Sequence, residues 1–243
     1  MLSVCIPPGC GDTSILIFGA TGQTGKKVLR AALDTGARVT VFVRNEKRIP
    51  PELRGKDSKL TVKVGNLTKL KDVTDIVSNA APSSIIITSA LARNESFRPL
   101  NTNLVPTIVK ALEYNGRLGS TKIVYLSGAF STEKAKKTDK ESAPLSCCLS
   151  CCVIPCFGIQ AMVRDNNNVG NYLLHDCNPA TQFTIVKMGY VSDAKSKGKK
   201  LVPVIGGKDP NQKVTFEDMG NLLVEIATAN KPELNRQIVF AKY

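Results

Sequence analysis

Tryptophan is absent from this sequence of 243 residues, and aromatic residues as a group account for only 5% of it. Surfaces that bind single-stranded nucleic acid usually stack the bases on aromatic side chains, so this scarcity argues against such a surface. The basic residues are dispersed along the chain, and no recognised nucleic-acid motif accompanies them. We therefore expect no nucleic-acid partner.

Histidine occurs once, as His175, so the histidine spacings of zinc enzymes are missing. The sequence also lacks a G-x-S-x-G turn and a nucleophile–base pair, the patterns that indicate a hydrolase. His175 lies at the end of an expected helix, where a lone histidine more often offsets the helix dipole than takes part in catalysis. We expect no metal site and no histidine chemistry.

Residues 1–13 lack the basic start and the long apolar stretch of a secretory signal. We therefore expect a cytoplasmic protein whose eight cysteines are reduced thiols. The formal net charge is +13, from 33 Lys and Arg against 20 Asp and Glu. We interpret this charge as the solvated surface of a basic enzyme, which also attracts phosphate-bearing ligands.

Short apolar runs alternate with helical patterns along the chain, which indicates a parallel sheet covered by helices on both faces. The expected strands are 15–18, 38–44, 60–64, 84–89, 122–126, 183–188, 201–205 and 237–241. The expected helices follow residue 25 and cover about 70–79, 101–115, 159–175 and 217–229. After an N-terminal tail at 1–13 we predict one doubly wound α/β domain over 14–243, with its crevice at the carboxyl ends of the strands.

A glycine-rich turn joins the first expected strand to the first helix. The apolar run 15–18 leads into Gly19, Gly22 and Gly25, and a helical pattern begins at once. Glycines let the backbone approach a diphosphate, and the helix start directs N–H groups and the positive end of its dipole at it. In this context the turn predicts dinucleotide binding.

The end of the second expected strand indicates which dinucleotide binds. In the common pattern an acidic residue stands there and holds the ribose hydroxyls. Here the strand ends in Arg44, and no carboxylate follows until Glu46. We expect Arg44 to meet a 2′-phosphate, which favours NADP(H) over NAD(H); the alternative is that Arg44 is only a surface residue.

The glycine motif at 19–25 and the Val-Phe-Val-Arg sequence at 41–44 resemble the atypical short-chain dehydrogenase/reductase superfamily. Within it the chain is most similar to the NmrA-like group, in particular the flavin reductase (biliverdin-IXβ reductase) relatives. The resemblance spans about residues 14–230, with supporting segments at 64–67, 123–127, 184–189 and 215–219. It implies a Rossmann-type fold that binds NAD(P). Two departures are Asn66, where the family usually has Asp, and Lys187-Met188, where relatives often have Arg-Pro.

The residues expected to bind the cofactor are Gly19, Thr21, Gly22, Gln23, Thr24, Gly25, Arg44, Asn66, Leu67, Ser89 and Ala90. Ser127 ends the fifth expected strand near the place of the nicotinamide, and we consider it both as a catalytic residue that orients substrate and as a turn residue.

The superfamily's Tyr-x-x-x-Lys pair is missing, because Tyr125 is followed by Ala129 and Tyr172 by Asp176. Flavin-reductase-like members also lack this pair, and in them hydride passes directly to a bound acceptor while solvent supplies the proton. The resemblance therefore implies an NADPH-dependent reductase of a small conjugated acceptor, of the flavin, quinone or tetrapyrrole type. The alternative is a non-catalytic NADP(H)-binding sensor, as some NmrA-like proteins are.

An apolar, cysteine-rich insertion occupies about residues 131–163 and follows a basic run. Its cysteines are Cys147, Cys148, Cys151, Cys152 and Cys156. Prolines and a glycine interrupt the segment, which argues against a membrane-spanning helix, and a thiolate metal site lacks a second separated Cys pair. We interpret it first as an apolar lid over the substrate. S-acylation beside the basic run is the alternative, and would bring peripheral membrane contact at the crevice, also through the basic loop 195–200.

Overall fold

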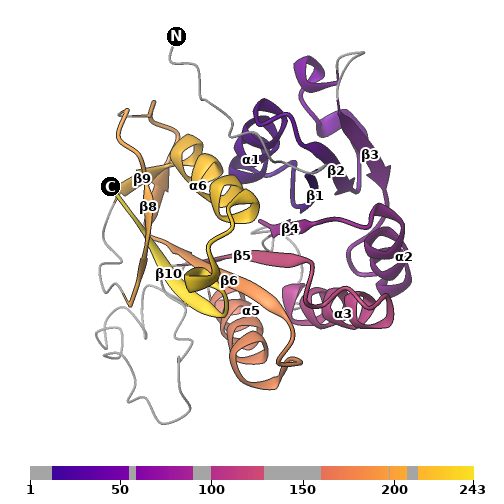
Figure 1. Ribbon diagram of the computed structural model, residues 1–243. Coiled ribbons are helices and arrows are strands. Elements are labelled where there is room, and N and C mark those ends of the chain that lie inside the picture. Colours follow the sequence, from indigo (N-terminus) through magenta and orange to yellow (C-terminus); the bar gives the residue numbers. More distant parts are fainter. Residues whose placement is uncertain (1–12, 55–58, 90–99, 129–159, 197, 207–212) are drawn as a thin grey trace.

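The computed structural model describes residues 13–54, 59–89, 100–128, 160–196, 198–206 and 213–243. At its centre is an eight-stranded sheet with the strand order β3-β2-β1-β4-β5-β6-β10-β8 (Figure 1). Its strands are β1 (Ser14–Phe18), β2 (Arg38–Val43), β3 (Leu60–Val64), β4 (Ser84–Ile87), β5 (Lys122–Gly128), β6 (Gln182–Met188), β8 (Val202–Ile205) and β10 (Gln237–Lys242). Only β8, at one edge, runs antiparallel to its neighbour. The predicted single α/β domain with a mostly parallel sheet is therefore confirmed.

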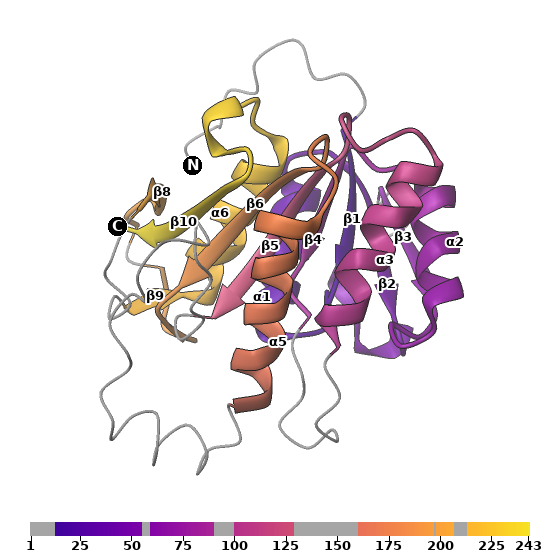
Figure 2. The same cartoon turned by 90° about the horizontal axis from the view of Figure 1, so that it is seen from below.

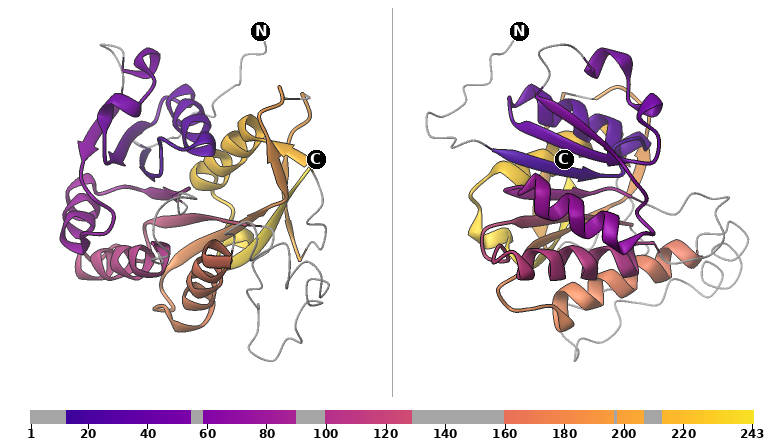
Figure 3. Two further views of the ribbon diagram at one scale, coloured as in Figure 1. Left: turned by 180° about the vertical axis from the view of Figure 1, so that it is seen from behind. Right: turned by 90° about the vertical axis from the view of Figure 1, so that its right-hand side faces the viewer.

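Helices cover both faces of this sheet. On one face lie α1 (Gln23–Asp34) and α6 (Phe216–Thr228), and on the other α2 (Leu70–Ala80), α3 (Asn101–Tyr114) and α5 (Gln160–Asn171) (Figure 2). The right-hand view of Figure 3 shows α2, α3 and α5 side by side in purple, magenta and orange.

Alternating side chains of the strands explain why the apolar runs are unbroken. In β1, Ile15 and Ile17 belong to the core under α1 and α6, whereas Leu16 and Phe18 belong to the core under α2 and α3. Because both faces are covered, all four positions from Ile15 to Phe18 are apolar and buried. This arrangement also places the carboxyl ends of the parallel strands along one rim.

Several elements differ from the sequence prediction. The helix expected over 159–175 changes after Asn171 into a π-helical segment at Tyr172–Asp176. Two short strands were missed, β7 (Tyr190–Ser192) and β9 (Lys213–Thr215), which pair with each other in a separate small sheet. With three residues each, they are too short to show an alternating pattern.

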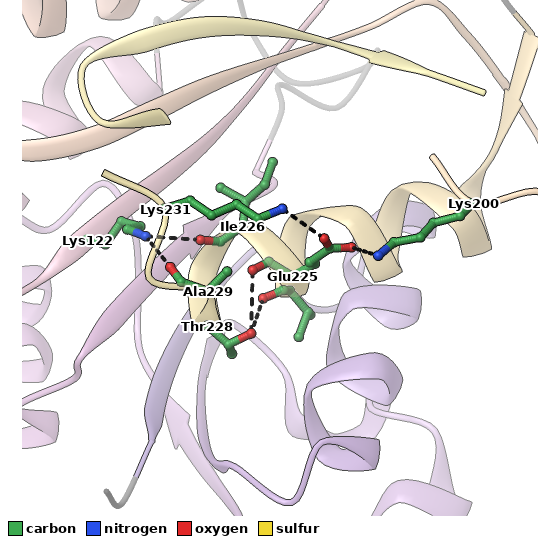
Figure 4. A network of polar contacts seen from close by, with 8 residues as sticks. Lys122, Lys200, Glu225, Ile226, Thr228, Ala229 and Lys231 are labelled. Atoms are coloured by element: carbon green, nitrogen blue, oxygen red, sulfur yellow. Dashed lines mark hydrogen bonds and ion pairs between the residues drawn. The ribbon is translucent and has the colours of Figure 1, made fainter. Parts of the chain in front are cut away.

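The side chain of Lys122 holds the carboxyl end of α6 to the sheet. Lys122 at the start of β5 donates from Nζ to the carbonyl oxygens of Ala229, at 2.8 Å, and Ile226, at 3.3 Å. Figure 4 shows this contact beside the Glu225 carboxylate, which pairs with Lys200 at 3.0 Å and Lys231 at 3.1 Å. Cations suit this end of a helix because its last carbonyls have no partners within the helix.

The cysteine-rich insertion lies largely outside the described residues. The same holds for the basic run before it and for its five cysteines, Cys147, Cys148, Cys151, Cys152 and Cys156. The lid and the membrane contact therefore stay predictions. Among the helices that the structure describes, none has the length and apolar character to cross a membrane. Within the same residues there is no cluster of three or more side chains suited to a metal ion.

Candidate functional site: a cavity at the strand ends

A cavity of about 500 Å³ lies along the rim formed by the carboxyl ends of β1, β2, β4, β5 and β6. The chain leaves β1 for β2 on one side and β4 lies on the other, so the strand order reverses at this point. Ligands of open α/β sheets bind at such a reversal, and the volume is typical of small-molecule sites.

Most of the residues predicted to bind the cofactor line this cavity. They are Gly19, Thr21, Gly22, Gln23, Thr24, Arg44, Asn66, Leu67 and Ser89. Gly25 is not among the described lining residues, and Ala90 lies outside the described residues. The structure thus brings these residues together, while their contacts with a cofactor stay a prediction.

The glycine turn forms the floor of the cavity. Gly19 has φ +86°, and a β-carbon there would stand 2.5 Å from the backbone nitrogen of Ser89. A β-carbon on Gly25 would overlap the carbonyl oxygen of Gly19. The turn is closed by a hydrogen bond from Gly22 N to Gly19 O at 3.0 Å. Glycine at 19 and 25 is therefore required by the protein's own backbone.

Helix α1 begins directly at the cavity. Its N-cap residue is Gly22, which has no side chain to cap the first turn, and that turn contains no acidic residue. The first N–H groups of a helix have no partners within the helix, and they carry the positive end of its dipole. Gly22 N already donates to Gly19 O, so the donors are the N–H groups of Gln23 and Thr24, which fit a diphosphate, the anionic centre of a dinucleotide.

Two arginines stand on the β2 side of the cavity. Arg44 and Arg48 are the only ionisable side chains in its described wall, and both are exposed. Asn45 caps the short helical turn Glu46–Arg48 by accepting a hydrogen bond from Lys47 N at 2.9 Å. Arg44 and Arg48 lie at the two ends of the segment that contains this turn, and both line the cavity.

The side chain of Asn66 is engaged in its own loop. Its Oδ1 accepts hydrogen bonds from the N and the Oγ1 of Thr68, both at 3.0 Å, and its backbone N donates to Asp72 at 3.1 Å. An amide oxygen has two lone pairs, and both are used here. Asn66 therefore shapes the wall, and its Oδ1 could accept a hydrogen bond from adenine only if the Thr68 hydroxyl turned away.

The β5 and β6 side of the cavity is largely apolar. Its wall includes Leu126, Met162 on α5 and Met188 at the end of β6. Ser127 lies between two wall residues of β5 but is itself 0% exposed and outside the described lining. Its proposed part in catalysis stays a prediction. His175 also lies outside the lining.

Sequence reasoning missed a buried polar network behind this wall. Tyr125 donates from its hydroxyl to Asn166 Oδ1 at 2.6 Å, and Asn166 lines the cavity. Asn101 at the start of α3 accepts a hydrogen bond from Ser89 Oγ at 2.7 Å and donates to Ser89 O at 2.8 Å. The weak signal for Asn166 was its position one helical turn after Met162, so that both face one side of α5.

Lys187, which departs from the family pattern, is buried inside β6. Its Nζ lies 5.8 Å from the centroid of the Phe240 ring, and the side chain is 6% exposed. A cation over an aromatic face is attracted by the ring electrons. The side chain of Lys187 is not part of the described cavity wall, whereas the following residue, Met188, is.

Solved structures of other proteins share this fold. A short-chain dehydrogenase/reductase of Veillonella parvula, solved in complex with NADP, is 18% identical with a TM-score of 0.66, covering 95% of this chain and 94% of that one. The anaerobilin reductase ChuY of Escherichia coli O157:H7 is 19% identical with a TM-score of 0.68, over 94% and 96%. An oxidoreductase of Lactococcus lactis is 15% identical with a TM-score of 0.69, over 94% and 90%.

A family model described as NAD(P)H-binding matches residues 19–230. The match runs from the first glycine of the turn to just beyond α6, and so includes the whole cavity wall described above. The turn, the uncapped start of α1 and the position at the strand reversal agree with it. We conclude that this chain belongs to the NAD(P)H-binding family.

Proposed function

We propose that the protein is an NADPH-dependent reductase that transfers hydride to a small conjugated acceptor, of the flavin, quinone or tetrapyrrole type. The observation that carries this proposal is the cavity itself. The glycine turn and the start of α1 offer N–H donors at its floor, the arginines stand on one side, and an apolar wall on the other. When bound, NADPH supplies the hydride.

Preference for NADPH rests on Arg44 and Arg48. A 2′-phosphate adds about two negative charges to the adenosine end, and guanidinium groups pair with phosphate through two hydrogen bonds. The described wall on this side contains no carboxylate that would hold a free ribose hydroxyl pair. Both features favour NADPH over NADH.

Direct transfer without a protein acid is supported by the composition of the wall. On the β5 and β6 side, the described lining contains no carboxylic acid, histidine, lysine, cysteine or tyrosine. The proton therefore comes from water, and the chain contributes by holding two reactants in contact. Such alignment alone can supply about 7–11 kcal/mol of the barrier reduction. The resemblance to flavin reductase relatives points the same way.

The test is NADPH oxidation by the purified protein with FMN, menadione and biliverdin as separate acceptors. We expect turnover with at least one of them and slower turnover with NADH. The lack of an acid in the described wall also favours a second candidate, an NADP(H)-binding sensor. Tight NADPH binding without turnover of any acceptor would establish the sensor and contradict the reductase.

A further inference from the structure

Asn166 presents an oriented amide to the cavity. The side chain is 7% exposed and forms part of the wall between Gly128 and Met162. Its Oδ1 accepts the hydrogen bond from the Tyr125 hydroxyl at 2.6 Å, and that tyrosine is fully buried. Because Oδ1 is held by Tyr125, the Nδ2 group is directed to the other side of the amide.

The Nδ2 group lies on the cavity side of this amide. A β-carbon built on Gly128, which lines the cavity, would stand 3.2 Å from Asn166 Nδ2. The structure gives Nδ2 no hydrogen-bond acceptor among the residues that it describes, and Nδ2 is not a fully enclosed atom there. A donor is therefore left for a ligand.

Helix α5 is fixed where it carries this amide. The preceding residue, Asp165, is buried and caps the start of α3. It accepts hydrogen bonds from Asn101 N at 3.0 Å, Thr102 N at 2.8 Å and Thr102 Oγ1 at 2.7 Å. Tyr125 holds the helix from β5, so Asn166 is tied from two elements. A donor positioned in advance needs no reorganisation during the reaction.

The residues around Asn166 Nδ2 indicate which kind of ligand group would accept its hydrogen bond. The neighbouring wall residues Leu126, Met162 and Met188 are apolar. A single donor in such surroundings favours an acceptor oxygen and is strengthened when that oxygen gains negative charge. A carbonyl conjugated to the reducible carbon has this property.

We propose that Asn166 Nδ2 donates a hydrogen bond to the carbonyl oxygen of the hydride acceptor, which makes conjugated carbonyl compounds such as quinones the acceptor class. The inference rests on the proposed reductase function. The acceptor gains hydride at a conjugated carbon, its π electrons move onto the carbonyl oxygen, and water protonates the resulting oxyanion. NADPH is oxidised to NADP⁺ in the same exchange, so atoms and electrons balance.

The test combines binding and turnover with menadione as the probe. In Asn166→Leu, which has a similar shape and no donor, menadione binding to the NADP⁺-loaded protein should weaken about tenfold by calorimetry. The kcat for menadione should fall about a hundredfold, as for loss of an oxyanion donor. NADP⁺ affinity should stay unchanged, which separates this role from a general loss of structure.

Matched variants keep the test independent of folding. Asn168→Leu changes an exposed residue of the same helix outside the described cavity wall and removes only a long hydrogen bond to Thr102 Oγ1, at 3.4 Å, so it should leave both menadione binding and kcat unchanged. Asn166→Asp keeps the size but repels the oxyanion, so its kcat should be at or below that of Asn166→Leu. Tyr125→Phe frees the amide to rotate and should give an intermediate loss, with little further loss when combined with Asn166→Leu.

The outcomes separate this inference from the proposed function. The inference is overturned if the NADP⁺-loaded wild-type protein does not bind menadione. It is also overturned if Asn166→Leu and Asn166→Asp bind menadione as tightly as the wild-type protein does. If menadione binding depends on Asn166 but NADPH is not oxidised with any acceptor, the reductase function fails and the carbonyl site stands. A loss of NADP⁺ affinity in Asn166→Leu would place the amide at the cofactor and also overturn the inference.

Discussion

At the scale of single residues, the three glycines of the turn differ in whether the fold leaves room for a side chain. Gly19 and Gly25 are required by the fold, since a β-carbon at either would collide with the neighbouring backbone. Gly22 is different, because a β-carbon there would meet only Gly19 O, at an ordinary 3.4 Å. A substitution at Gly22 therefore tests ligand binding at the turn separately from folding.

We expect Gly22→Ala to fold normally and to weaken NADPH binding about tenfold, or about 1.4 kcal/mol, because the added methyl group blocks close approach of the diphosphate. Calorimetric titration with NADPH measures the affinity, and thermal unfolding measures the stability. Gly119→Ala is the control, since no atom lies within 4 Å of a β-carbon there. Unchanged affinity in Gly22→Ala would contradict diphosphate binding at this turn.

Charge at the end of β2 is the second residue-scale feature. Arg44→Asp should lower NADPH affinity about 10- to 100-fold and NADH affinity far less, because only NADPH carries the 2′-phosphate. Arg38→Asp makes the same change of charge at the opposite end of β2 and controls for net charge. Titration of each variant with both cofactors measures the effect, and equal losses for the two would show that Arg44 does not discriminate.

At the scale of elements, the start of α6 is fastened by one carboxylate. Thr215 caps the helix by accepting a hydrogen bond from Asp218 N at 3.1 Å and donates from its hydroxyl to Asp218 at 2.7 Å. Ser196 and Tyr243 also donate to this carboxylate, at 2.6 and 2.7 Å. Asp218 thereby joins α6 to the loop after β7 and to the last residue of the chain.

Burial by itself raises the pKa of Asp218, but the hydrogen bonds from Ser196, Thr215 and Tyr243 outweigh it and hold the pKa below its ordinary value of 3.8. A carboxyl whose pKa is lowered by folding stabilises the protein above its unfolded pKa. That contribution is lost as the pH falls through the folded pKa. The effect is therefore complete at neutral pH and is lost progressively as the pH falls below about 4.

Asp218→Asn should accordingly reduce the free energy of unfolding by about 1–3 kcal/mol at pH 7, as expected for hydrogen bonds to a buried charge. The difference from the wild-type protein should shrink as the pH is lowered below 4. Urea unfolding at both pH values measures this, with Glu217→Gln on the same helix turn as the control. A difference that stays constant with pH would contradict the role of the charge.

At the scale of the whole molecule, the cavity draws on segments distant in sequence. Its wall combines the turn after β1, the end of β2 and the ends of β4, β5 and β6 with the first turns of α5 and α6. Ligand binding should therefore stabilise the fold as a unit, since anything that binds only the native state shifts the unfolding equilibrium.

NADP⁺ at about a hundred times its dissociation constant should add about 2.7 kcal/mol, which corresponds to a rise in Tm of about 5–10 °C for a domain of this size. The same concentration of NAD⁺ should give a much smaller rise. Thermal unfolding with each cofactor measures both values, and Arg44→Asp should remove most of the difference. Equal shifts in the wild-type protein would contradict the NADP preference.

The sequence predicted much of this arrangement because its signals are local. Unbroken apolar runs determined the parallel strands, and the glycine turn with the following helix determined where a dinucleotide would bind. The position of Arg44 at the cavity follows from the same kind of signal, since it stands directly after a strand, and its role in binding stays a prediction. The strands β7 and β9 were missed because three residues carry no period.

Only the tertiary structure decided which side chains lie on the β5 and β6 side of the cavity. The Tyr125–Asn166 hydrogen bond joins residues 41 apart in sequence, and the hydrogen bonds that Thr102 donates to Asp165 join residues 63 apart. The sequence pattern of a single segment cannot predict these hydrogen bonds, because they form only when β5, α3 and α5 pack together. The sequence by itself determined a fold with a nucleotide turn. Packing decided which amide faces the cavity, since a side chain's partners depend on elements brought together from far along the chain.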